Sequence, residues 1–119
     1  MALTASATAQ IRVMSYNIAQ FKGDSNALSD VLSQASADDS HGFATPVSIF
    51  LFQEVHEADI NLLQAVVGSG YTKATFTDQN DSSWGGAQAM FYHSKQFVEN
   101  NALHEDIFTG AGRHADRWA

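Results

Sequence analysis

The stretch SIFLFQEV, residues 48–55, decides the fold class, because it is an apolar run of strand length that ends in polar side chains. The stretch IRVMSYNI, residues 11–18, has the same character and carries Asn17 near its end, as the other carries Gln53 and Glu54. Polar groups at the end of a buried strand need partners, and sites in α/β domains tend to lie at strand ends. The pair therefore predicts two central strands, covered on both faces, whose ends suit metal and phosphate chemistry.

The remainder of the chain alternates helical and strand patterns. One amphipathic helix, capped by Asp24 or Ser25, is predicted by apolar residues at positions i, i+3, i+4 and i+7, which are Leu28, Val31, Leu32 and Ala35. A second helix should follow Asp59 and end at the glycines 68 and 70. Further strands are predicted at 71–77 and 88–93 and within 97–108, followed by a Gly-rich stretch at 109–119 that ends without an evident stop. The fold class is therefore α/β, with the first two strands as parallel neighbours.

Composition limits the classes of function. The 119 residues suffice for one domain, and the formal charge of −7 does not steer the chain toward nucleic acid or anionic membranes. The chain has no cysteine, which excludes disulfides and thiolate metal sites, and no apolar run reaches the ~20 residues that span a bilayer. Residues 1–10 read either as a disordered tail or as the small-residue end of an export signal, so the compartment stays open, with secretion or a periplasmic location among the choices.

Four residues are candidates for chemistry. Glu54 could bind Mg²⁺ or Mn²⁺, since Mg²⁺ often takes only one or two carboxylates; otherwise it is a surface carboxylate capping a turn. Asn17 could contact a phosphate oxygen and orient Glu54, or it could fix a turn. Trp84 could stack on substrate or anchor its loop on the sheet. Arg113 could hold a phosphate or stay solvated at the surface.

Three segments resemble the endonuclease/exonuclease/phosphatase superfamily, which has the deoxyribonuclease I-like fold. They occur in family order and are RVMSYNI at 12–18, LFQEV at 51–55 and GGAQAMFY at 85–92. The resemblance implies a mixed sheet with helices on one face, as half of a four-layer αββα sandwich. It implies Mg²⁺-dependent phosphodiester hydrolysis, with Glu54 as metal ligand, Asn17 at the metal and the scissile phosphate, and Gln53 in support.

The resemblance covers residues 11–119 and corresponds to the N-terminal portion of a family domain. Two later family elements, an Asp-x-Asn and a Ser-Asp-His, are not identifiable in the sequence, so this chain alone is expected to be inactive. Its partner would be a phosphodiester, such as DNA, RNA or a phosphoinositide. The uncovered sheet face would either pair with a second copy or make the chain aggregate. The alternatives are a non-catalytic half-domain and a small α/β ligand-binding module. No Gly-rich phosphate loop follows the first strand, which counts against the second alternative.

Overall fold

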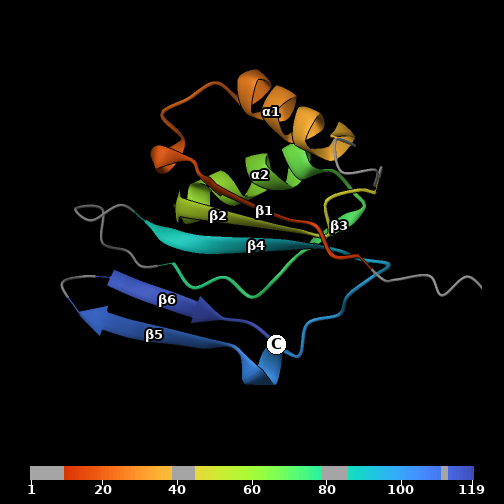
Figure 1. Cartoon of the computed structure of the whole chain (residues 1–119). Coiled ribbons are helices and arrows are strands. Elements are labelled where there is room, and N and C mark those ends of the chain that lie inside the picture. Colours follow the sequence, from red (N-terminus) through yellow and green to blue (C-terminus); the bar gives the residue numbers. More distant parts are fainter. Residues whose placement is uncertain (1–9, 39–44, 79–85, 111–112) are drawn as a thin grey trace, which may run out of the picture.

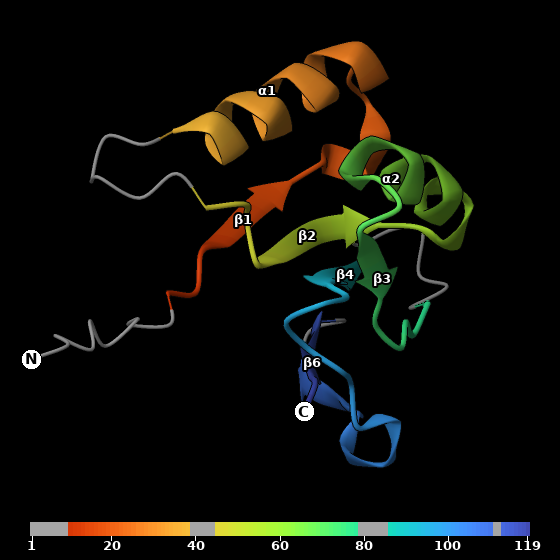
Figure 2. The same cartoon turned by 90° about the vertical axis from the view of Figure 1, so that its right-hand side faces the viewer.

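The computed structural model describes residues 10–38, 45–78, 86–110 and 113–119. These residues form a mixed four-stranded sheet with two α-helices on one face and a separate two-stranded hairpin on the other (Figure 1). The view turned by 90° shows the same three levels (Figure 2). The predicted α/β class and the placement of both helices on one face are thereby confirmed.

The sheet contains β1 (Val13–Asn17), β2 (Ile49–Val55), β3 (Tyr71–Lys73) and β4 (Ala87–His93) in the order β1-β2-β4-β3. Strands β1 and β2 are parallel, as predicted, whereas β4 runs antiparallel to both of its neighbours. The parallel pair brings the ends of β1 and β2 to the same edge of the sheet, which is where the polar side chains lie.

The two helices are delimited by local signals in the sequence. Helix α1 (Ser25–Ala37) is capped by Asp24, whose carboxylate accepts a 2.7 Å hydrogen bond from the backbone N–H of Asn26, as predicted. Helix α2 (Ile60–Val67) ends at Gly68, which adopts a φ of 94°. Asp59 precedes α2 without capping it, because its carboxylate accepts from the backbone N–H of His56 and closes the short helix η2 (Glu57–Asp59).

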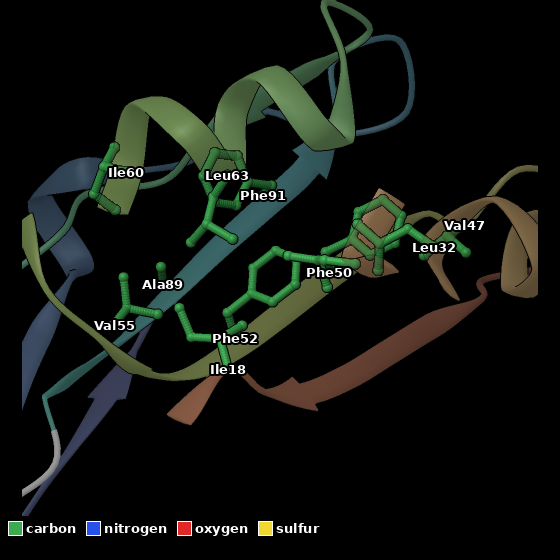
Figure 3. Close-up of a cluster of buried hydrophobic side chains, with 11 residues drawn as sticks. Ile18, Leu32, Val47, Phe50, Phe52, Val55, Ile60, Leu63, Ala89 and Phe91 are labelled. Carbon is green, nitrogen blue, oxygen red and sulfur yellow. The ribbon is translucent and has the colours of Figure 1, made fainter. Parts of the chain in front are cut away.

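The hydrophobic core lies between the helices and one face of the sheet (Figure 3). Phe50 lies opposite Phe91, and Phe52 lies opposite Ala89, so these four buried side chains share the helix-facing side. The helices contribute mainly Leu28, Leu32, Ile60 and Leu63. The buried side chains of the sheet thus come mainly from its two interior strands, β2 and β4.

Strand β1 differs from the prediction, because it is an edge strand of the four-stranded sheet. Val13 is 56% exposed, and Tyr16 is also exposed. An apolar pattern on both faces indicates that other elements can pack on each face of the strand. It does not determine whether another strand pairs along each of its edges. The structure therefore leaves one side of β1 unpaired among the described strands.

Arg12, just before β1, holds the end of α1 in place. Its guanidinium donates to the carbonyl oxygens of Ala35 and Ser36, in the last turn of the helix, and to that of Thr45. A cation at a helix C-terminus satisfies carbonyls that lack a partner within the helix and is favoured by the helix dipole. Arg12 therefore links β1, α1 and the segment that leads into β2.

The strand predicted within 97–108 is present as the first part of β5, whereas no strand was predicted in the Gly-rich segment 109–119. That segment contributes to a hairpin of β5 (Glu105–Gly110) and β6 (Arg113–Arg117), which follows the short helix η3 (Asn101–Leu103). The hairpin lies beyond the sheet on the side away from the helices (Figures 1 and 2). The residues between β4 and η3 and those after β6 line a cavity of about 210 Å³ against this face, so the face expected to be uncovered is covered in part.

Strand β3 stops after Lys73 rather than at Thr77, because the backbone of Thr75 has other partners. Its N–H donates to both carboxylate oxygens of Glu99, at 3.0 and 2.9 Å, and its carbonyl accepts a 2.8 Å hydrogen bond from the indole N–H of Trp118. These bonds attach the C-terminal segment to the sheet.

None of the helices in the described part of the chain has the length and apolarity needed to cross a bilayer.

Candidate metal and phosphate site

Asn17 and Glu54 meet at the edge where β1 and β2 end. In the parallel register Asn17 lies beside Gln53, and its side-chain Nδ2 donates to Glu54 Oε1 at 2.9 Å. Asn17 is exposed and Glu54 is half-buried, so the pair is accessible from solvent. The prediction that the strand order would bring these two residues together is confirmed.

The orientation of the Asn17 amide follows from its other hydrogen bond. Its Oδ1 accepts a 2.7 Å hydrogen bond from the backbone N–H of Ala19, so Nδ2 must be the atom that faces Glu54. The chain then continues through η1 (Ala19–Phe21), where Ala19, Gln20 and Phe21 have φ values of 49°, 55° and 53°. Left-handed backbone at three successive non-glycine residues is unfavourable, and here it places the Ala19 N–H on Asn17.

Glu54 lies in an irregularity of β2. The pairing with β4 shifts between Phe52 and Val55, and Glu54 has a φ of 56°. The preceding residue, Gln53, anchors the strand end, because its Nε2 donates to the hydroxyl of Ser15 at 2.8 Å and to the carbonyl of Leu51 at 3.3 Å. Backbone strain of this kind often accompanies a functional site.

The donor atoms at this edge suit a hard cation that takes few of its ligands from the protein. Among the described residues, the Glu54 carboxylate accepts one hydrogen bond, through Oε1, which leaves Oε2 open to another partner. The carbonyl oxygen Oδ1 of Asn17 has a second lone pair beyond the one used by Ala19. The described residues contain no cluster of three or more His, Asp or Glu side chains arranged around a common point, so substrate and water would have to complete a Mg²⁺ shell.

A cavity of about 240 Å³ adjoins Asn17 on the side of η1 and α1. Tyr16, Phe21 and Val31 give it a largely apolar wall, whereas Asn17 and Asp24 bring polar groups to it. The cavity therefore offers room for an uncharged group next to the polar edge.

The structure does not test the other predicted site residues. Trp84 lies outside the described residues. The backbone of Arg113 begins β6 opposite Gly110, and its side chain is likewise outside the described part. Strand β6 begins at the same end of the molecule at which β1 and β2 end (Figure 1). His56, two residues after Glu54, belongs to the capping box of η2.

The hairpin carries two His–Asp pairs that sequence reasoning missed. His104 Nε2 lies 3.0 Å from Asp116 Oδ1, and His114 Nδ1 lies 2.9 Å from Asp106 Oδ1. The Asp116 side chain is fully buried, and its Oδ2 has no hydrogen-bond partner among the described residues. Burial raises the pKa of Asp116, and the hydrogen bond with His104 opposes that rise. The available signal was that each strand carries a His two residues before an Asp, at 104–106 and at 114–116.

Comparisons of the chain with protein-family models, with curated proteins and with solved structures find no match.

Proposed function

We propose that residues 11–119 form the metal-binding portion of a Mg²⁺- or Mn²⁺-dependent phosphodiesterase domain of the endonuclease/exonuclease/phosphatase type. The sheet with its two helices would be one half of a four-layer αββα sandwich. The observation that carries the proposal is the 2.9 Å hydrogen bond between Asn17 and Glu54 at the common edge of two parallel strands. The three sequence segments that resemble the superfamily contribute β1, the end of β2 and β4.

Each residue has a role that its contacts allow. Glu54 supplies carboxylate oxygen to the cation, and Asn17 holds Glu54 in place through Nδ2. Asn17 is itself held by Ala19, so it can also present its remaining Oδ1 lone pair to the cation. Gln53 acts as a support, because its bond to Ser15 ties the end of β2 to β1.

A bound Mg²⁺ would neutralise charge on a phosphoryl oxygen and favour ionisation of a water molecule. With one carboxylate as the main donor, the affinity should be weak, about millimolar. Among the described histidines, His104 and His114 pair with aspartates in the hairpin, and His93 Nδ1 accepts a hydrogen bond from the backbone N–H of Lys95. His56 precedes η2, where its backbone N–H donates to Asp59. We therefore expect metal binding without efficient turnover in this chain, since loss of a general base alone costs about 10²–10⁴-fold.

The competing proposal is a non-catalytic module that binds an anionic or metal-bound ligand at the same edge. It has the same dependence on Asn17 and Glu54 for binding and predicts no hydrolysis under any condition. The formal charge of −7 favours a ligand that arrives with a cation over a bare anion.

The test is a calorimetric titration of the chain with Mg²⁺ and Mn²⁺, followed by an assay on bis(p-nitrophenyl) phosphate with each metal. Glu54→Gln should abolish metal binding, whereas Glu57→Gln, a change at an exposed carboxylate three residues later, should not. Equal metal affinity in the wild type and Glu54→Gln would overturn the proposed site. Metal-dependent hydrolysis that is lost in Glu54→Gln would decide for the enzyme over the binding module.

A further inference from the structure

Strand β2 changes its side-chain alternation immediately before the site. Phe50 and Phe52 face the helices, so a regular strand would turn Glu54 into the same apolar core. Instead Val55, three residues after Phe52, is fully buried in that core. One extra residue in the strand achieves this, and the ladder with β4 resumes at the pair of Val55 and Ala87.

The extra residue has a conformational cost at Glu54. Its φ of 56° is left-handed, which is unfavourable for a side chain that has neither the freedom of glycine nor the local hydrogen bonding of asparagine. Such a conformation persists only where the surroundings enforce it. The feature that enforces it should therefore be found in direct contact with the Glu54–Val55 peptide.

Gly86, the residue before β4, makes that contact. A Cβ at this position would lie 2.8 Å from the carbonyl oxygen of Val55, 2.9 Å from the carbonyl carbon of Glu54 and 3.0 Å from the nitrogen of Val55. All three are backbone atoms, which cannot move aside as the end of a flexible side chain can. Gly86 also has a φ of 78°, so glycine meets two requirements here at once.

We propose that Gly86 is a positioning residue for the Asn17–Glu54 pair. Because it lacks a Cβ, the start of β4 can lie against the Glu54–Val55 peptide. This contact holds the bulge that keeps the Glu54 carboxylate out of the core and aimed at Asn17. The effect on metal binding rests on the proposed function, whereas the effect on the hydrogen bond between Asn17 and Glu54 does not.

Three glycine substitutions separate the causes. Gly86→Ala introduces both a left-handed alanine and the backbone clash. Gly68→Ala introduces the left-handed alanine alone, since Gly68 has a φ of 94° and nothing within 4 Å of a Cβ. Gly70→Ala introduces neither. All three chains are compared by NMR, with the Asn17 side-chain amide signal assigned through Asn17→Ala, and by Mg²⁺ titration.

The wild type should show a shifted and slowly exchanging Asn17 amide signal, and Gly86→Ala alone should lose it. Gly86→Ala should also weaken Mg²⁺ binding by about tenfold or more, as loss of a supporting residue does at metal sites. Gly68→Ala and Gly70→Ala should keep both properties. A Gly86→Ala chain that retains the wild-type Asn17 signal would overturn the inference, as would loss of the signal in Gly68→Ala to the same degree.

Two results keep this inference separate from the proposed function. If the wild type binds no Mg²⁺, the proposed function fails, and the Asn17 signal still tests the role of Gly86. If Gly86→Ala does not fold, the three-bond coupling between the amide and α protons of Glu54 in the wild type provides the test. A coupling typical of extended backbone at Glu54 would show that no bulge is held there and would overturn the inference.

Discussion

Replacing Glu54 by glycine should give a more stable protein than replacing it by alanine, in reverse of the usual order within strands. Both variants lose the carboxylate and its hydrogen bond to Asn17, so their difference isolates the backbone. At a φ of 56° alanine should carry about 1–2 kcal/mol of left-handed strain that glycine avoids. Glycine loses about 0.5–1 kcal/mol through its greater freedom in the unfolded chain. The glycine variant should therefore be more stable by about 0.5–1 kcal/mol.

Urea unfolding of the two variants, followed by circular dichroism, measures this difference directly. The matched control is the pair Thr72→Gly and Thr72→Ala at an exposed position of β3, where alanine should be the more stable by about 0.5–1 kcal/mol. Opposite signs at the two positions would support a left-handed Glu54. If alanine is the better residue at both, Glu54 is not strained, and the bulge cannot be the means by which its carboxylate is aimed.

Three further predictions concern the rest of the molecule. Arg12→Met should lower the free energy of unfolding by about 2 kcal/mol, because three carbonyls lose a charged donor. The control Arg117→Met removes an ion pair whose side chains are more than half exposed, so it should change the free energy of unfolding by less than about 0.5 kcal/mol. Urea unfolding measures both variants. Phe52→Ala should cost about 3–5 kcal/mol, which calorimetric melting would show as a large drop in Tm or as loss of the cooperative transition. The raised pKa of Asp116 means that the folded chain binds this proton more tightly than the unfolded chain, so stability should fall as the pH rises above the ordinary carboxyl pKa of about 4. Asp116→Asn should therefore gain stability relative to the wild type as the pH rises above that value, and the opposite trend in a urea series would contradict the assignment.

Local signals in the sequence predicted much of the first two-thirds of the fold. Asp24 marks the start of α1, and Gly68 marks the end of α2, because each satisfies backbone requirements that exist at that residue alone. The approach of Asn17 to Glu54 was also predictable, since a strand, helix and strand in succession give parallel neighbours that end together. The hairpin at 105–117 was predicted only in its first strand, because both of its strands are mostly exposed and lack an apolar alternation.

The amino-acid sequence by itself determined which side chains stand at the ends of β1 and β2 and that these ends share one edge. Tertiary structure alone decided that β1 is an edge strand, because the number of neighbours of a strand is a property of the whole sheet. It also decided that Glu54 turns away from the core. That outcome depends on the close approach of Gly86 to the Glu54–Val55 peptide, a contact between residues distant in the sequence that no periodicity of β2 could reveal.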